Sequence, residues 1–358
     1  MSTPFYPSAT HVLPLTAIRR ERRLPWRGEV LISTRQQVEP SDVVARAARP
    51  GAYAIIDVAQ QLGVPVHRAG KYYLKQPGEF VQQGELLARR KGKLVGGRKI
   101  TSPVEGRVVA AVGGRIVIEP QSDLFELRAL LSGLVTNTTS GLGVTIETAG
   151  ALIQGVWGTR REGYGSLTMG VEQPDAVLDG ERIEVAHHGS ILVCGATLDL
   201  NLLAKAQEMQ VRGLIVGGVP ADLREEISQH LLPVIATEGM GRIPISSPIF
   251  GLLQANEGHE TMLLAPAPGR PWVDRPEIII PLPASTLPAP PPRPGTELTA
   301  GHKVRIIRAP RRGSVGIVKE MYDESRIVDN GIRYPGADVV LETGEVVFVP
   351  FVNLDVVG

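Results

Sequence analysis

The reactive side chains of this chain are few, and their spacing decides what chemistry they can perform. Its single cysteine, Cys194, lies near the end of the apolar stretch GSILVCGAT, which predicts a strand buried on both faces. A thiol becomes a nucleophile when a neighbouring base activates it. The nearest histidines, His187 and His188, precede the same strand and are expected to point away along its length. Adjacent histidines also lack the i, i+2 or i, i+4 spacing of two metal ligands on one face. The pattern favours an inert buried thiol and no metal site.

Composition narrows the class of protein. One cysteine in 358 residues excludes an internal disulfide and a thiolate-rich zinc site, and it favours a reducing compartment. The first residues lack the apolar core of a secretory signal, and no apolar run approaches the ~20 residues that span a bilayer. We therefore expect a cytoplasmic protein with no membrane span and no cofactor. Forty glycines, 29 prolines and 4% aromatic residues favour short strands joined by turns.

The elements around Cys194 alternate between strand and helix. Continuous apolar runs predict strands at 189–197, 212–219, 232–239 and 259–266. Residues with helical periodicity or helix-start signals predict helices at 198–211, 220–231 and 246–258. Together they predict a small α/β layer with a mainly parallel sheet.

Three loops follow these strands, at 194–197, 217–220 and 237–242. Ligands of open α/β sheets bind beyond the carboxyl ends of the strands, and helix N-termini offer unpaired N–H groups to anions. One interpretation is a small-ligand pocket that involves Thr197, Glu238 and Arg242. The other is that the glycines of these loops make tight turns. Because no G-x-G-x-x-G or P-loop motif is present, nucleotide binding is not supported.

Basic residues gather in two stretches where they could contact a partner or nucleic-acid phosphates. The hairpin RRKGKLVGGRK has six without an acid, and HKVRIIRAPRRG has five that precede every acid of the C-terminal segment. These residues are Arg89, Arg90, Lys91, Lys93, Arg98 and Lys99, and then Lys303, Arg305, Arg308, Arg311 and Arg312. The alternative in both places is a solvated surface. Since the segment from residue 300 has eight basic and eight acidic residues, its local basic rim favours a specific docking contact. Its few aromatic residues include Phe348 and Phe351, which we expect in the core.

The first half of the chain contains internal repeats. VEPSDVVAR at 38–46 matches VQQGELLAR at 81–89, and EGRVVAAVGGRIVIEP matches SGLVTNTTSGLGVTIET. The stretch PGEFVQQGELLAR followed by ITSPVEGRVV resembles the barrel-sandwich hybrid of lipoyl and biotinyl domains. The resemblance covers roughly residues 28–155. Similar modules occur in the largest subunit of bacterial RNA polymerase and in a subunit of a membrane electron-transport complex. A carrier domain presents its modified lysine within Met-Lys-Met or Asp-Lys-Ala, and no lysine of the basic hairpin has that neighbourhood, so a swinging-arm site is not favoured.

The C-terminal stretch AGHKVRIIRAPRRGSVGIVKEMYDE resembles the KOW motif. The matching residues are Gly301, Val304, Ile306, Gly313, Gly316 and Val318. The resemblance implies an SH3-like barrel of about five strands over 300–358, which in other proteins contacts RNA, the ribosome, RNA polymerase or other proteins. The phrases GVWGTRREGYG, RGLIVGG and TEGMGRIPISSPIFGLL are similar to a family of bacterial proteins with a C-terminal KOW segment, which implies the domain order and no activity. Before the barrel, residues 281–295 contain seven prolines, which favours a semi-rigid polyproline II spacer.

These observations predict a β-rich, multi-domain protein. We expect an N-terminal extension at 1–27, a barrel-sandwich hybrid at 28–155, the α/β layer at 156–265, a proline-rich linker at 266–299 and the KOW-type barrel at 300–358. The predicted function is a non-enzymatic adaptor that binds a protein partner or itself, with the spacer tethering two recognition modules. The alternatives are a factor associated with nucleic acid, the ribosome or RNA polymerase, a self-assembling structural protein and a small-molecule sensor.

Overall fold

The structure is a computed structural model that describes residues 4–49, 51–91, 97–121, 124–264, 275–288, 290, 297–328 and 331–357. It is built mainly of strands in several sheets, as the sequence predicts. No helix among these residues is long and apolar enough to cross a membrane. Lys93 and residues 291–295 of the proline-rich spacer lie outside the described residues.

The largest sheet of the described residues has eleven strands, and we call it the central sheet. Its strands are β2 (Val12–Arg23), β4 (Gln37–Val38), β13 (Gly133–Thr139), β14 (Gly143–Gln154), β15 (Trp157–Gly158), β16 (Gly163–Met169), β17 (Ser190–Val193), β18 (Gly213–Val219), β19 (Val234–Met240), β20 (Glu260–Leu264) and β21 (Glu277–Pro281). Strands β16 to β19 are parallel neighbours. The predicted parallel layer is therefore confirmed, as part of a larger mixed sheet.

Helices follow the parallel strands as predicted. They are α3 (Leu200–Glu208), α4 (Arg224–Gln229) and α5 (Ser247–Ala255), with the short helices η2 (Gly180–Arg182) and η3 (Val185–His187) nearby. Helix α3 begins where the side chain of Asp199 accepts a hydrogen bond from the Leu202 amide, which satisfies one orphan donor of the first turn. Helix α4 is shorter than predicted, because the chain makes a turn between Pro220 and the first helical residue, Arg224.

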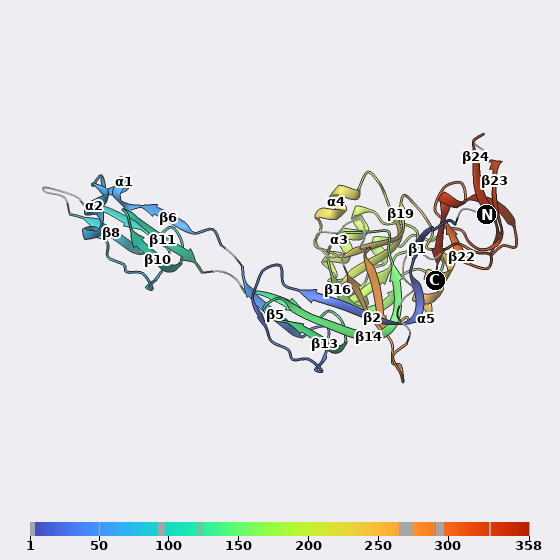
Figure 1. The fold of residues 1–358 in the computed structure, drawn as a ribbon, viewed down its shortest axis with the longest axis horizontal. Coiled ribbons are helices and arrows are strands. Elements are labelled where there is room, and N and C mark those ends of the chain that lie inside the picture. The colour runs from blue at the N-terminus through green and yellow to red at the C-terminus, as the bar shows by residue number, and fades with distance from the viewer. Residues whose placement is uncertain are drawn as a thin grey trace.

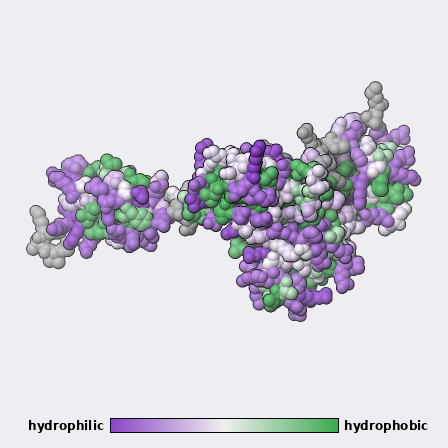
Figure 2. All heavy atoms as spheres, turned by 90° about the horizontal axis from the view of Figure 1, so that it is seen from below, coloured by the Kyte–Doolittle hydropathy of each residue, from purple (hydrophilic) through white to green (hydrophobic). Residues whose placement is uncertain are grey.

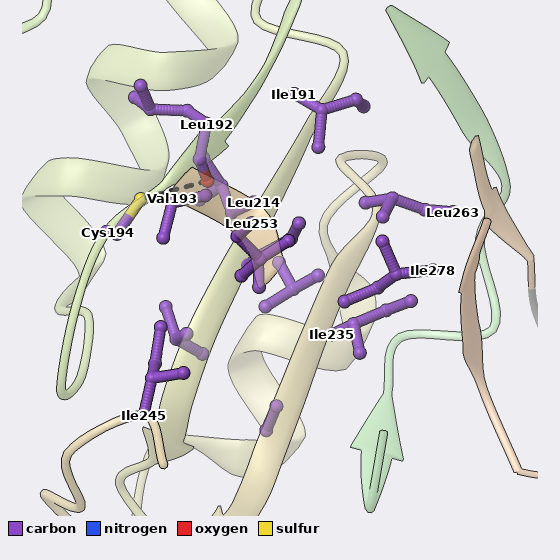
Figure 3. Close-up of a cluster of buried hydrophobic side chains, with 14 of the residues drawn as sticks. Ile191, Leu192, Val193, Cys194, Leu214, Ile235, Ile245, Leu253, Leu263 and Ile278 are labelled. Carbon is purple, nitrogen blue, oxygen red and sulfur yellow. Dashed lines mark hydrogen bonds between the residues drawn. The ribbon is translucent and has the colours of Figure 1, made fainter. Parts of the chain in front are cut away.

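The core of this layer forms because both faces of its strands are covered. Every residue of β17 and β18 is buried, which matches their unbroken apolar sequences. Figure 3 shows Ile191, Leu214 and Ile235 from successive parallel strands gathered with Leu253 of α5. Cys194 continues β17 into the same cluster.

The segment 28–155 forms two β modules. The distal one has its own apolar core, whereas the core of the proximal one is shared with β2, β20 and β21. The proximal module, residues 28–49 and 124–155, contains β3 (Glu29–Val30), β4, β5 (Val43–Ala48), β12 (Leu124–Arg128), β13 and β14. The distal module, residues 54–120, contains β6 (Ala54–Asp57), α1 (Val58–Leu62), α2 (Val66–Ala69), η1 (Gly70–Tyr72), β7 (Phe80–Val81), β8 (Leu86–Arg90), β9 (Arg98–Thr101), β10 (Gly106–Val112) and β11 (Arg115–Pro120). The distal module lies apart from the rest of the chain in both views (Figure 1, Figure 2).

The two modules pair their strands in the same register. In the proximal module Val38 of β4 pairs with Gly133 of β13, and in the distal module Val81 of β7 pairs with Gly106 of β10. A register shift then follows at the same position of the hairpins β13–β14 and β10–β11. The repeated stretches of the sequence therefore occupy equivalent places in two similar units.

The distal module is inserted into a hairpin of the proximal module. Strands β5 and β12 pair Arg46 with Glu126, and the equivalent strands β8 and β9 pair Arg89 with Lys99. In the distal module β8 ends at Arg90 and β9 begins at Arg98, whereas in the proximal module the whole distal module stands between β5 and β12. The architecture is thus a duplication in which one copy is nested inside the other.

The first and last parts of the chain share one sheet, which we call the C-terminal sheet. It contains β1 (Ser8–Thr10), β22 (Lys303–Ile306), β23 (Val315–Ile327), β24 (Arg333–Leu341), β25 (Val346–Pro350) and β26 (Leu354–Val357), with η4 (Phe351–Asn353) before the last strand. Strand β1 runs parallel to β26, and Phe5 stacks on the buried Phe351 with ring centroids 5.1 Å apart. Within residues 1–27, which the sequence predicted to be an N-terminal extension, β1 completes this sheet and β2 pairs with β14.

Substitutions at one pair of matching turn positions test whether the two modules are structurally equivalent. Arg35 (φ 70°) and Gly78 (φ 97°) occupy equivalent turns, and their amides donate to the carbonyls of Val135 and Val108. A left-handed conformation costs a residue with a Cβ about 1–2 kcal/mol. We expect Gly78→Ala to lower the free energy of unfolding by about 1 kcal/mol and Arg35→Gly to leave it unchanged or slightly raised. Urea unfolding measures both changes. A neutral Gly78→Ala together with a destabilising Arg35→Gly contradicts the equivalence.

Candidate functional site

A cluster of buried charged residues joins the C-terminal sheet to the central sheet. Arg305 of β22 is 3% exposed. Its Nη1 lies 2.9 Å from Glu238 Oε2, and its Nη2 lies 2.7 Å from Asp355 Oδ2. The guanidinium also donates to the carbonyl of Thr237 and the hydroxyl of Thr10. One arginine therefore connects strands β1, β19, β22 and β26.

Strand register brings the members of this cluster together. Arg305 and Asp355 are cross-strand partners on β22 and β26, so their side chains project from the same face of the C-terminal sheet. Glu238 lies near the carboxyl end of β19 in the central sheet. Its second oxygen, Oε1, accepts a hydrogen bond from the Ser246 amide at 3.0 Å. Each charge in the interface thus has an opposite charge and hydrogen-bond partners, which is the condition for burying it.

The structure corrects the expected role of Arg305. Strand alternation places Lys303 and Arg305 on one face of β22, and both were predicted to contact a partner. The central sheet covers that face at Arg305, whereas Lys303 is exposed and 4.0 Å from Glu342. Arg305 is therefore a contact within the chain and is not available to a separate molecule.

Other contacts extend the same interface. Arg312 donates from Nη1 to the Met240 carbonyl at 3.1 Å and from Nη2 to the Glu238 carbonyl at 3.2 Å. Gly239 has a φ of 130°, a conformation that favours glycine, and a Cβ there would displace the end of the Arg312 side chain. Ser247 of α5 donates to Glu342 of the C-terminal sheet. The remaining rim residues face solvent: Arg311 pairs with Glu345 across 2.5 Å, and Arg308 is exposed.

The predicted ligand edge is occupied by the chain itself. A Cβ on Gly217 would meet the Ile243 carbonyl oxygen at 1.9 Å, and one on Gly195 would meet the Ala176 carbonyl oxygen at 2.0 Å. These glycines let other backbone segments cross the strand ends.

The three residues proposed for that pocket have separate roles. Glu238 belongs to the buried charge cluster, and Arg242 is exposed. Thr197 has a buried hydroxyl with no hydrogen-bond partner among the described residues. A shallow cavity of about 360 Å³ lies elsewhere, at the amino ends of the parallel strands, and its lining includes Ser166 and Arg212.

Cys194 is positioned as the sequence predicts. It is fully buried, its thiol lies 3.5 Å from the Leu192 carbonyl oxygen, and burial raises the pKa of the thiol well above its usual range (Figure 3). His187 accepts a hydrogen bond from the Glu184 amide, and His188 bonds to Gln210. The environment of Cys194 is that of a small apolar side chain.

The basic hairpin β8–β9 divides into two groups. Arg90 donates to the carbonyl of Leu62 at 2.9 Å, and Arg98 donates to that of Gln61 at 3.1 Å, so both cap the end of α1. The others described, Arg89, Lys91 and Lys99, are exposed, and Arg89 lies directly opposite Lys99 in the strand pair.

An aromatic and cationic cluster lies on β23 to β25, where the sequence singled out no site. Arg326 Cζ lies 3.5 Å from the centroid of the Tyr322 ring, and Phe348 lies 6.4 Å from the same ring. Phe348 is half-buried here, whereas it was expected in the core. The Tyr322 hydroxyl lies 2.6 Å from Glu320 Oε2 and 2.9 Å from Asp338 Oδ2. The hydrogen bond to Glu320, aided by desolvation and by Asp338, raises the pKa of Tyr322 to about 12.

Cross-strand pairing was the missing signal for this cluster, because Glu320, Asp338 and Phe348 are neighbours only in the folded sheet.

Comparison with protein-family models found no matching family, and comparison with curated proteins found no matching sequence.

The buried cluster predicts a large effect of one substitution. Arg305→Met leaves the carboxylate of Glu238 buried without its cation, which is expected to lower the free energy of unfolding by about 3–5 kcal/mol. The exposed Arg311→Met removes an ion pair with Glu345 and is expected to cost less than about 1 kcal/mol. Chemical unfolding of both variants checks the difference. Equal, small losses would mean that the Arg305 cluster does not stabilise the interface.

The hydrogen bonds of Tyr322 predict a pH window. Because the folded pKa of about 12 lies above the ordinary value of 10.0, their contribution is fully present below pH 10 and is lost as the pH rises toward 12. Stability measured by urea unfolding from pH 9 to 12 is therefore expected to fall more steeply in the wild type than in Tyr322→Phe. Tyr334→Phe is the control and keeps the wild-type slope. Identical slopes for all three proteins would contradict the assignment.

Proposed function

We propose that the chain is a non-enzymatic adaptor that holds separate recognition surfaces on one rigid frame. The observation that carries this proposal is the buried Arg305 cluster, which joins the C-terminal sheet to the central sheet through two carboxylates. A buried cation with two buried partners resists separation, because parting the sheets leaves charges that must be solvated or paired again.

The docking of the C-terminal sheet on the central sheet changes the way in which the adaptor is expected to present its binding surfaces. The sequence suggested a semi-rigid proline-rich spacer that lets the terminal barrel engage one surface while the rest of the chain engages another. With the cluster in place, the spacer connects two parts that are already docked. The adaptor then gains from fixed geometry, since a preorganised surface loses less conformational freedom on binding. The proposed location of the adaptor is the cytoplasm, because a single cysteine favours a reducing compartment.

The C-terminal sheet is the first recognition module of the proposal, as a KOW-type, SH3-like barrel. Gly313 (φ 87°) turns the chain between β22 and β23. Gly316 faces β24 so closely that a Cβ would meet the Val340 carbonyl oxygen at 2.5 Å. Both glycines are positions of the KOW-like pattern, and the structure gives each a physical reason. The backbone roles of these two glycines support the resemblance to the KOW motif independently of the basic residues in that stretch.

The docking face that we propose for a protein partner is the outer surface of β23 to β25. Ile317, Val340 and Val346 form a cross-strand row on this surface. Ile317 is 54% exposed and Val346 is 48% exposed. The Tyr322–Arg326 pair lies farther along the same strands. An exposed apolar row beside tyrosine and arginine has the composition of an interface centre.

One observation favours the second candidate, a factor associated with nucleic acid, the ribosome or RNA polymerase. The exposed part of the β8–β9 hairpin carries Arg89, Lys91 and Lys99 with no acidic neighbour in the strand pair. This surface lies on the distal module and not on the proposed docking face. The two functions are therefore compatible in one adaptor, with different surfaces for different partners.

A comparison of surface variants tests the adaptor proposal. The double variant Ile317→Asp/Val346→Asp places charges on the docking face. The double variant Val185→Asp/Leu231→Asp makes the same change in the α/β layer, at residues that are 79% and 68% exposed. Affinity capture from the native cell, followed by binding of the purified partner, is expected to show at least a tenfold weaker affinity for the first variant only, because two buried charges each cost more than about 1 kcal/mol. Equal binding by both variants, or capture of nothing by the wild type, contradicts the proposal.

A further inference from the structure

The two nested modules have the same strand register and opposite charge. Residues 51–121, which contain the distal module, have eleven Lys or Arg and five Asp or Glu, a net charge of +6. The proximal module, 28–49 and 124–155, has four Lys or Arg and five Asp or Glu, a net charge of −1. Since the proximal module forms the same pairing without the excess, the fold does not require it.

The difference is concentrated around one pair of equivalent arginines. In the proximal module Arg46 holds the carboxylate of Glu29, with Nε at 3.0 Å and Nη2 at 2.8 Å from Oε2. Its cross-strand partner is a second acid, Glu126. Arg46 is therefore paired with Glu29 and lies across from a second acid, which pairs with Arg128.

In the distal module both acids are replaced. The residue opposite Arg89 is Lys99 in place of Glu126. The bridge Tyr73–Ala88 corresponds to the pair Val30–Ala45, so Tyr72 takes the place of Glu29. Like charges directly opposite each other in a strand pair destabilise it. An anion bound between Arg89 and Lys99 removes that cost.

Most other cations of the distal module are used by its fold. Lys75 pairs with Glu79 and Glu85, and Arg115 pairs with Asp57. Arg90, Arg98 and Arg107 donate to backbone carbonyls. Arg89, Lys91 and Lys99 are exposed and form no side-chain hydrogen bond or ion pair with other described residues. Lys71, on the short helix η1 that packs beside β8, is exposed as well.

We propose that the β8–β9 hairpin binds the phosphate backbone of a nucleic acid. Its exposed cations are spread over two paired strands, Arg89 on β8 and Lys99 on β9, which suits a chain of phosphates better than a single small anion. Arg89 and Lys91 are two residues apart, so they extend along one strand while Lys99 lies across from Arg89. The contact is expected to be electrostatic and independent of base sequence. It rests on the second candidate function proposed above, whose ligand class it names, and it does not depend on the proposed docking face of β23 to β25.

Fluorescence anisotropy of the full chain tests the proposal. The probes are a labelled 20-nucleotide single-stranded RNA and DNA and duplex DNA of the same length, in KCl from 50 to 300 mM. We expect binding that weakens with salt. The variant R89E/K91E/K99E is expected to lose at least tenfold in affinity for single strands, with the slope of log affinity against log salt reduced by about 2, because three phosphate contacts each contribute ~0.7.

Two controls separate a site from general charge. R19E/R23E/R27E makes the same change of net charge at exposed arginines of the body and is expected to bind as the wild type does. Vesicles of phosphatidylserine and phosphatidylcholine test a lipid surface as the source of phosphate. Three results overturn the proposal: no binding of any nucleic acid at 50 mM KCl, equal loss in both triple variants, or binding to vesicles alone. Because the substituted side chains are exposed, matching circular dichroism and melting curves are expected for all three proteins.

Discussion

A single arginine between two carboxylates sets the arrangement of this molecule. Arg305 connects Glu238 of the central sheet to Asp355 of the C-terminal sheet, and it is almost completely buried. Burying an ion pair yields little net stability by itself, but breaking one is costly because the remaining charges stay in a low-dielectric interior. The relative position of the proposed docking face follows from this contact.

The other organising feature is a duplication whose copies have diverged in charge. The proximal module runs into the central sheet through β13 and β14, and its Arg46 is neutralised by Glu29. The distal module keeps the register and has its own core, while Arg89 faces Lys99. When two copies of a fold satisfy the same packing rules, a difference in surface charge is informative about function, because stability has no need of it.

Local patterns in the sequence were enough to predict the strands and helices of the α/β layer. Continuous apolar runs gave β17, β18 and β19, and they placed Cys194 in the core. The charged interface was out of reach, because alternation assigns Arg305 to a face of β22 and cannot say what covers that face. Its partners are 67 and 50 residues away in sequence. The repeats were visible in the sequence, but the insertion of one copy into a hairpin of the other depends on pairing between β5 and β12 across the whole distal module.

The most direct test of the account cuts the connection and asks whether the interface holds. A protease site placed within residues 291–296 allows the chain to be cleaved between the central sheet and β22. Size-exclusion chromatography with light scattering then measures whether the two fragments remain together. Strand β1 stays with the first fragment and pairs with β26, so the cleaved wild type is expected to elute as one complex. The cleaved Arg305→Met complex, which keeps this pairing and loses the buried cation, is expected to dissociate at a lower urea concentration. Separation of the wild-type fragments, or a complex equally stable without Arg305, would contradict it.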